Sequence, residues 1–577
     1  MSHSSKIFEE VPIKVQNKNG FDLSHLNCGT SKCGQLVPVL CKLLPPNSDF
    51  TLGAALNVEL PPLATSFMGR IDAILEGFVV PCSILYGGWK QFISNQQSTM
   101  FPDNQNVSFD GYALPYVHLN ALMPGSGDGV ADYKKLLSTN DCLGEYLGLR
   151  TYTGIIDAPD IKVSLLPFLA YGLIWDVYYR NKQVTKTIFA VNPNLAKDSS
   201  YGDFNYRNVS LIWHSFYCNY TDGISSPYSP DFSSPILDSM DEALEGYPSD
   251  WLTFPDGISV FSTRQRNYAR DYFTASTPDP QQGQASSLRF DISGDEGEFT
   301  ISALRAASSL QRFLETNNLS GDYSDLLRNR WGTRPIDADF DEPYYLGRVV
   351  LPVYQKSVYQ QDSSGKSGAT NPFAAAGAIG VKGAHGSFVG EGSIVEKFHN
   401  STWSYVMCLF SLVPHAAYGQ GINRELTMLE LGHFPAPELQ SLGNEEIMSY
   451  ELFLDGFTSP SKTFGYIPRY SRFKYMDDEV HGELRMGQSL DSFVLQRSLS
   501  NIGEADGITL TTSFLEINQS DLDDVFAVST DSMNLSCWYE IYFSFKVSMP
   551  LADFCIPTLG DIQDTHTIKS KQGGSRL

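Results

Sequence analysis

Apolar and polar residues alternate along several stretches of the chain, and this alternation predicts β-strands. The clearest stretch ends at Pro550. Its apolar positions are Tyr539, Ile541, Phe543, Phe545, Val547 and Met549, and most of the residues between them are polar. Because side chains of a strand alternate between its two faces, we expect a strand here with one buried face and one exposed face.

Further strands are predicted at Ile74–Tyr86, in part of Ile161–Tyr179, at Tyr345–Tyr354 and at Trp403–Val413. The last of these is apolar on both faces, which is typical of a strand inside a sandwich. Helices are few. Residues 302–315 have apolar side chains at helical spacing, and residues 323–330 precede Gly332, a residue type that commonly ends helices.

Two long stretches are predicted to be loops, because one is crowded with Asn, Asp, Ser, Tyr, Gly and Pro and the other with Gly, Ser and Ala. Strands separated by such excursions favour a mainly β fold, a jelly-roll sandwich with long loop insertions and a few short helices. We expect a core made of residues 21–181, 263–354 (with the two helices) and 396–560. The other predicted parts are an N-terminal arm (1–20), a surface insertion that is a candidate protrusion (182–262), a Gly/Ser-rich loop (355–395) and a flexible tail (561–577).

The composition is poor in charge: 18% of the 577 residues are charged, against about 25% in typical soluble domains. With 47 Gly, 31 Pro and 12% aromatic residues, this favours a loop-rich β-protein that buries much of its surface, partly against other subunits. An ordinary secreted β-protein fits the composition equally well. The formal net charge of −24 argues against a protein that neutralises phosphate with its own surface.

The nine cysteines are odd in number and scattered. They lack the spacing of a disulfide framework or a zinc site, so we expect buried free thiols. The first ten residues have no apolar core of a secretory signal, and no apolar run reaches the roughly 20 residues that span a bilayer. We therefore expect the chain to fold in the cytosol.

Segments that resemble motifs for cofactor or metal binding lack residues that those motifs require. The segment around Lys366 resembles a phosphate-binding loop but has Gln360 where the first glycine belongs. Asp337, Asp339 and Asp341 have the spacing of a calcium loop but are followed by Glu342 instead of glycine. We therefore predict no catalytic residue, no cofactor and no metal. A glycosidase-type pair of carboxylates, which needs no local motif, remains open.

One short basic stretch is a candidate for contact with single-stranded nucleic acid, because cations interleaved with an aromatic residue suit phosphate contacts and base stacking. It contains Arg264, Arg266, Tyr268 and Arg270, and the tail adds Lys569, Lys571 and Arg576. The alternative is that these arginines form ion pairs within the protein or between subunits, and that the tail is a frayed terminus.

Five segments of the chain form a recognisable series. The longest is RNYARDYFTASTPDPQQG, Arg266–Gly283. The others are FDLSH (Phe21–His25), YYLG (Tyr344–Gly347), AYGQGINREL (Ala417–Leu426) and GYIPRYSRFKY (Gly465–Tyr475). In the same order along the chain, these segments resemble the major capsid proteins of microviruses, in particular the gokushovirus-like branch. Residues 182–262 and the Gly-rich segment depart from the family pattern.

The resemblance implies an eight-stranded jelly roll of the viral capsid type, without enzymatic activity, whose copies form the smallest (T=1) icosahedral shell of a bacteriophage virion. It implies circular single-stranded DNA as the packaged genome and assembly in the cytoplasm of the host bacterium. The implied partners are an internal scaffolding protein, a DNA pilot protein and a small basic DNA-binding protein. The last partner agrees with the net charge.

The insertion at 182–262 is expected to contact a host surface receptor, because loops vary without disturbing the strands beneath them. The candidate contact residues are aromatic: Tyr201, Tyr206, Trp213, Tyr217, Tyr220 and Tyr228. Alternatively, these side chains pack the insertion against itself or against neighbouring copies. A different function, a carbohydrate-binding or carbohydrate-active β-sandwich, is also consistent with aromatics and scattered carboxylates, although the absent signal segment and unpaired cysteines disfavour it.

Overall fold

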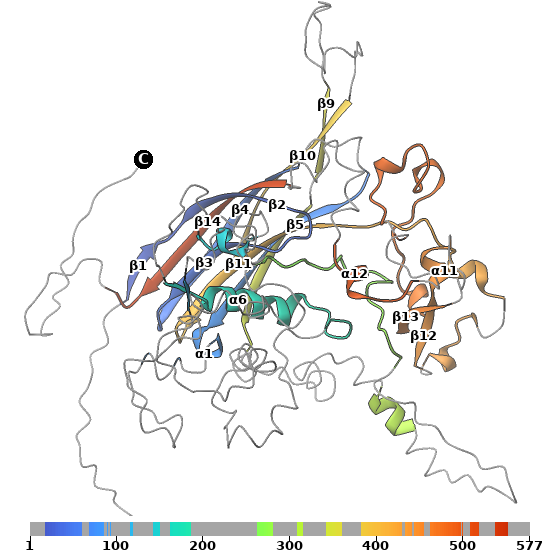
Figure 1. Cartoon of the computed structure of the whole chain (residues 1–577), viewed down its shortest axis with the longest axis horizontal. Helices are drawn as coiled ribbons and strands as arrows, with labels where there is room; N and C mark the ends of the chain where they lie inside the picture. Colours follow the sequence, from blue (N-terminus) through green and yellow to red (C-terminus); the bar gives the residue numbers. More distant parts are fainter. Residues whose placement is uncertain are drawn as a thin grey trace, which may run out of the picture.

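The computed structural model describes residues 18–60, 68–85, 89, 93, 116–118, 142–149, 162–185, 262–280, 308–314, 342–352, 354–359, 382–429, 433–440, 443–454, 462–497, 499, 508–517 and 537–551. Two antiparallel sheets dominate this part of the chain (Figure 1). The first contains β1 (Asn19–Asp22), β2 (His25–Ser31), β14 (Cys537–Met549), β4 (Ser48–Glu59), β10 (Lys382–Asn400) and β9 (Tyr354–Tyr359). The second contains β3 (Val37–Leu44), β11 (Ser404–Pro414), β5 (Ile71–Pro81) and β8 (Tyr344–Pro352).

The order of the strands is that of a jelly roll. In the first sheet β2, β14, β4 and β10 are neighbours in that order, and in the second β3, β11, β5 and β8 are neighbours. These eight strands follow one another along the chain as β2, β3, β4, β5, β8, β10, β11 and β14, so the chain passes repeatedly from one sheet to the other. The first strands pair with the last strand, which ties the two ends of the fold together. The predicted eight-stranded jelly roll is confirmed.

The alternation found in the sequence explains the main core. Side chains of β14 are alternately buried and exposed along the strand, and those of β4 follow nearly the same pattern. Their apolar residues, Phe543 and Phe50 among them, meet those of β3, β5 and β11 between the two sheets. The strands predicted at 345–354 and 403–413 are also present, as β8 and β11.

A second core lies on the other face of the second sheet, where α6 (Leu166–Ile174) and a π-helical turn, η2 (Trp175–Tyr179), cover β5 and β11 (Figure 1). The prediction of a strand within 161–179 was wrong apart from β7 (Lys162–Ser164), which pairs with β6 (Tyr116–His118). α6 is buried on nearly all sides. A short, uniformly apolar run has no periodicity that separates a buried helix from a buried strand.

The prediction of a Gly/Ser-rich loop at 355–395 was wrong at its two ends, which form β9 and the first part of β10. In Figure 1 this β9–β10 ribbon extends beyond the other strands. Glycine is required where β10 crosses β8. A Cβ on Gly392 would lie 2.8 Å from Val349, and one on Gly347 would lie 2.3 Å from the carbonyl oxygen of Ile394. Gly392, one of the glycines that suggested a loop, therefore allows close approach of two sheets.

A third core belongs to a smaller unit beside the sandwich, which we call the satellite and define as the described residues from 417 to 499 and from 508 to 517 (Figure 1). Its elements are β12 (Asn444–Met448), β13 (Thr463–Pro468), α11 (Ser449–Leu452), α12 (Thr512–Leu515) and the 3-10 turns η8 (Arg424–Thr427), η10 (Pro437–Leu439), η11 (Ser471–Phe473), η12 (Gly482–Leu484) and η13 (Asp491–Phe493).

The remaining described helices are short. α1 (Cys82–Leu85) follows β5, α5 (Leu143–Tyr146) lies beside β3, and residues 308–314 are helical inside the helix predicted at 302–315. The helix predicted at 323–330 lies outside the described residues. In the part of the chain that the structure describes, no helix is both long and apolar enough to cross a membrane.

The seven described cysteines are free, as expected, and five of them are buried. Burial raises the pKa of the Cys82 thiol to about 12, so this thiol is protonated at neutral pH. Such cysteines act as small apolar residues of the core.

Because β8 and β10 cross closely, the stability of the fold should be sensitive to a methyl group added at Gly347. Gly347 has a φ of 154° and no space for a Cβ, so Gly347→Ala should lower the free energy of unfolding by about 2 kcal/mol or more. Gly20→Ala is the matched control, because no atom lies within 4 Å of its added Cβ. Denaturant unfolding of the unassembled chain measures both. Equal losses at the two positions would contradict the close crossing.

Candidate assembly site

Residues 262–280, here called the central segment, connect the three cores. Tyr268 packs in the main core, and Tyr272 and Phe273 pack in the satellite core. The guanidinium of Arg264 lies 4.6 Å from the ring centre of Trp175 in the second core. Backbone hydrogen bonds fasten the segment on both sides, as in Arg266 N–H to the carbonyl oxygen of Gly34 at 2.7 Å.

A buried ion pair anchors this segment on the second sheet. Arg266 Nη1 lies 2.8 Å from Glu76 Oε2 on β5 and also donates to Ser411 Oγ on β11. The hydroxyl of Tyr179, from the π-helical turn, donates to the same Glu76 oxygen at 2.6 Å. Burial raises the pKa of Tyr179 well above its ordinary value, and the adjacent Glu76 raises it further. The network thus joins two strands, the π-helical turn and the central segment.

The structure shows how the residues of the basic stretch lie, but it does not test their contact with nucleic acid. Arg264 and Tyr268 are buried, at 2% and 6% exposure, which disfavours contact with DNA through these side chains. Arg266 is mostly buried and paired with Glu76, so the alternative of ion pairs within the protein holds for it. Arg270 is exposed and stays a candidate. The spacing of arginines and aromatics is the same for stacking inside a protein as for contact with DNA, and sequence alone does not separate the two.

The other predicted site residues lie outside the described residues: Lys569, Lys571 and Arg576 of the tail, and Tyr201, Tyr206, Trp213, Tyr217, Tyr220 and Tyr228 of the insertion. Their roles stay predictions. Glu76 was not among the predicted site residues, although a single carboxylate inside the apolar run ILEGFVVP is a recognisable signal. A carboxylate in a strand buried on both faces needs a cationic or hydrogen-bonding partner.

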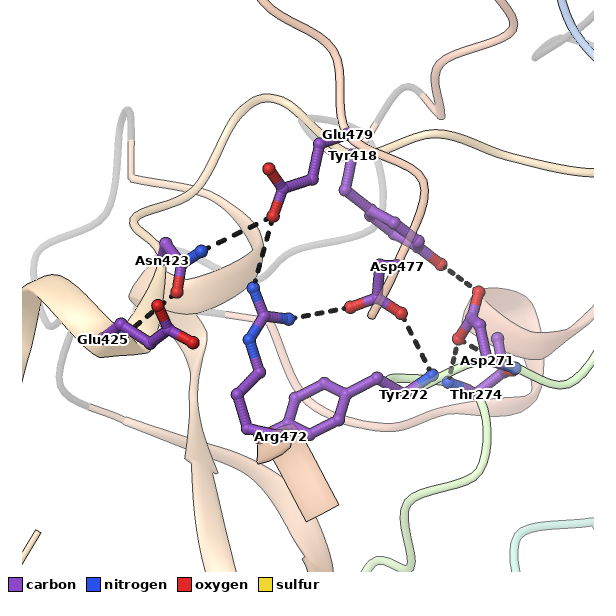
Figure 2. Close-up of polar contacts among 9 residues, drawn as sticks. All are labelled: Asp271, Tyr272, Thr274, Tyr418, Asn423, Glu425, Arg472, Asp477 and Glu479. Atoms are coloured by element: carbon purple, nitrogen blue, oxygen red, sulfur yellow. Dashed lines mark hydrogen bonds and ion pairs between the residues drawn. The ribbon is translucent and has the colours of Figure 1, made fainter. Parts of the chain in front are cut away.

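A second polar cluster joins the central segment to the satellite (Figure 2). Asp477 accepts a hydrogen bond from the backbone N–H of Tyr272 at 3.2 Å and pairs with Arg472 Nη1 at 3.0 Å. Arg472 Nη2 lies 3.5 Å from Glu479, which also accepts from Asn423. The cluster therefore ties the turn after β13 to the residues that precede η8.

Asp271 forms the other half of this cluster. Its carboxylate accepts a 2.6 Å hydrogen bond from the hydroxyl of Tyr418 and another from the backbone N–H of Thr274 (Figure 2). Burial, together with the nearby negative charge of Asp271, raises the pKa of Asp477 to about 6. Two carboxylates in one half-buried cluster disfavour simultaneous ionisation, and Arg472 only partly offsets this.

Exposed apolar side chains gather on the satellite. Leu426, Leu429 and Met476 are 77%, 87% and 78% exposed. Other large apolar residues of the satellite that are at least two-fifths exposed are Phe434, Leu454, Phe473, Tyr475 and Leu490. Exposed apolar groups collected in one unit are typical of surfaces that contact another macromolecule. The described residues include no group of His, Cys, Asp and Glu placed to hold a metal ion.

An eight-stranded jelly roll in two packed sheets is the fold of many proteins that build viral shells, and lectin and cupin domains share it. The exposed apolar residues of the satellite favour the first class, in which subunits contact one another. Comparison with known families agrees. The model of the family described as "Capsid protein (F protein)" matches residues 10–559, and the chain belongs to this family.

Two relatives, both from microviruses, are named "Capsid protein VP1". The one from Bdellovibrio phage phiMH2K is 23% identical over 509 residues, which cover 85% of this chain and 87% of the relative. The one from Chlamydia phage 1 is 22% identical over 626 residues, covering 96% and 97%. The resemblance to microvirus capsid proteins is thereby confirmed, and the chain is a structural component of a capsid.

The polar cluster predicts a particular pH dependence. Because the pKa of Asp477 is raised to about 6 from an ordinary 3.8, the folded chain binds more protons than the unfolded chain between these values. This group therefore stabilises the fold below about pH 4, and that contribution is lost as the pH rises through about 6. The substituted side chain cannot titrate in the variant Asp477→Asn, so its free energy of unfolding should change less between pH 4 and 7 than that of the unsubstituted chain. The slopes of the two free energies against pH should differ by at most about 1.4 kcal/mol per pH unit.

Chemical denaturation at several pH values measures this dependence. Asp478→Asn is the matched control, since it removes the same charge from the adjacent, exposed position. The pH dependence of the control should follow that of the unsubstituted chain. If Asp477→Asn also follows it, Asp477 does not titrate as the cluster requires.

Proposed function

We propose that this chain is the major capsid protein of a small bacteriophage and that many copies assemble into a T=1 icosahedral shell around a circular single-stranded DNA genome. The observation that carries the proposal is the jelly-roll order of strands within a chain that matches a capsid family over residues 10–559. Exposed apolar residues on the satellite support contacts between copies. The role is structural and includes no catalysis.

The charge distribution supports a basic partner inside the shell. The chain has a net charge of −24, and two of the four candidate residues in the basic stretch are buried while Arg266 is neutralised by Glu76. An acidic coat repels packaged DNA unless another component supplies cations. We therefore propose a small basic DNA-binding protein in the virion, with Arg270 and the tail residues Lys569, Lys571 and Arg576 as coat residues that contact DNA.

The remaining partners follow from the resemblance to microviruses. We propose that assembly takes place in the cytoplasm of the host bacterium with an internal scaffolding protein and a DNA pilot protein. The insertion at 182–262 is proposed to contact the host receptor through its aromatic residues.

The alternative of a carbohydrate-active sandwich has little support from the groove at the open edge of the sheets. This groove, of about 370 Å³, lies between β2 and β3 and has no Asp or Glu among its lining residues. Hydrolysis of a glycosidic bond commonly uses two carboxyl groups facing the substrate. The groove does not offer them.

Assembly of the purified chain tests the proposed function. Subunits that expose apolar patches should associate into pentamers, shell fragments or complete shells. Sizing chromatography and negative-stain microscopy, with and without scaffolding protein, measure this. A chain that stays a soluble monomer at high concentration, also with scaffolding protein present, would contradict a capsid function.

A further inference from the structure

The turn that follows β13, residues 468–476, has an unusual backbone. We call it the knob. Tyr470 has a φ of 64°, in the left-handed region that a bulky side chain rarely adopts, and its side chain is buried. Such a conformation is strained and persists where the surroundings fix it, often at functional sites. The knob therefore leaves β13 in a fixed direction.

The base of the knob is held on the central segment. Arg472 lies over the ring of Tyr272, with 5.4 Å between the guanidinium carbon and the ring centre, and pairs with Asp477 (Figure 2). The hydroxyl of Ser471 donates to the carbonyl oxygen of Pro468. A turn fixed in this way loses little conformational entropy when it binds a partner.

The tip of the knob is exposed over four consecutive residues, Phe473, Lys474, Tyr475 and Met476. Phe473, Tyr475 and Met476 are 47%, 45% and 78% exposed. Three large apolar side chains within four residues of an exposed turn are typical of a surface that contacts another macromolecule. We therefore expect the tip to contact a partner through its apolar side chains.

The charges of the knob indicate the partner. Its tip has one cation, Lys474, and no carboxylate, and the exposed Asp478 and Glu479 follow it in the chain. Residues 469–479 together carry three cations and three carboxylates, within a chain whose net charge is −24. Copies with that charge repel one another, so a locally neutral surface with a cation at its tip is favoured for contact with an acidic surface of a neighbouring copy. Single-stranded DNA fits less well. Arg472 is paired with Asp477, Arg469 lies over the ring of Tyr470, and Met476, the most exposed apolar residue of the tip, is aliphatic.

We propose that the knob docks onto an acidic, partly apolar surface of a second copy of this chain, with Met476 and Lys474 as its main contact residues. This inference rests on the proposed assembly of the chain into a shell and assigns one of its contacts to a particular turn. The apolar side chains of the tip would be buried against the second copy, and Lys474 would lie close to carboxylates of that copy.

Two pairs of variants test the docking. Met476→Ser removes an apolar contact, and Leu310→Ser makes the same kind of change at an exposed position in the helical residues 308–314. Lys474→Glu reverses a charge, and Lys397→Glu makes the same change on the exposed side of β10. Each exposed substitution should leave the unfolding midpoint of the chain nearly unchanged.

Association of each variant is followed by light scattering and analytical ultracentrifugation over a range of protein concentrations. Each knob variant should need about ten-fold more protein for half-maximal association than the unsubstituted chain, the effect of losing a central contact residue. Its matched control should shift the curve much less. Because salt screens charges, high salt should narrow the difference between Lys474→Glu and the unsubstituted chain.

Several outcomes would overturn the inference. If the knob variants associate like their controls, the knob is not a contact between copies, whereas the proposed function stands. If the unsubstituted chain does not associate at all, also with scaffolding protein present, the proposed function fails and the inference with it. If the knob variants assemble normally but bind a fluorescent single-stranded oligonucleotide more weakly, the partner of the knob is DNA.

Discussion

The ion pair between Glu76 and Arg266 is the interaction on which the arrangement of the three cores depends. Glu76 belongs to β5, which is buried along almost its whole length because the sandwich core covers one face and α6 with the π-helical turn covers the other. A carboxylate in such a place is costly unless it is paired and its remaining lone pairs accept hydrogen bonds. Arg266 and Tyr179 meet both conditions.

The consequence is that a chain segment without regular secondary structure holds a fixed place. Arg266 pins the central segment to the second sheet, and the residues before and after it then reach different cores: Arg264 stacks on Trp175, and Tyr272 enters the satellite. A jelly roll by itself positions only its own strands. Here the buried pair also determines where the satellite, and with it the exposed knob, lies relative to the sheets. For a subunit of a shell, that position governs which surface a neighbouring copy meets.

The sequence allowed prediction of those elements whose pattern depends on a single buried face. The alternation in 539–549 could be read directly because water lies on one side of β14 and the core on the other. α6 could not be assigned, since burial on nearly all sides removes the polar face that marks a helix. β10 was obscured by its glycines, of which Gly392 is required by the crossing with β8 and not by a loop.

The candidate site was harder to predict than the fold because its residues come from distant parts of the chain. Arg266 and Glu76 are 190 positions apart, and Asp477 lies 205 positions from Tyr272. A basic, aromatic stretch has the same local appearance whether its partners are phosphates or a buried carboxylate. Only the tertiary contacts of Arg264 and Arg266 distinguish the two. The exposure of Met476 could not be predicted either, because an apolar residue in a sequence is ordinarily expected to lie in the core.

A double-mutant cycle on Glu76 and Arg266 tests the central role of their ion pair most directly. Denaturant unfolding of the unassembled chain gives the free energies for Glu76→Met, Arg266→Met and the double variant. Each single substitution leaves an unpaired buried charge and should cost about 3–5 kcal/mol, whereas the double variant should cost clearly less than the sum of the two. Arg270→Met, at the exposed end of the same stretch, should change the free energy by about 0.5 kcal/mol or less. The central role of the ion pair would be contradicted if the losses in free energy of the two single variants added up to that of the double variant. It would also be contradicted if these losses were no larger than that of Arg270→Met.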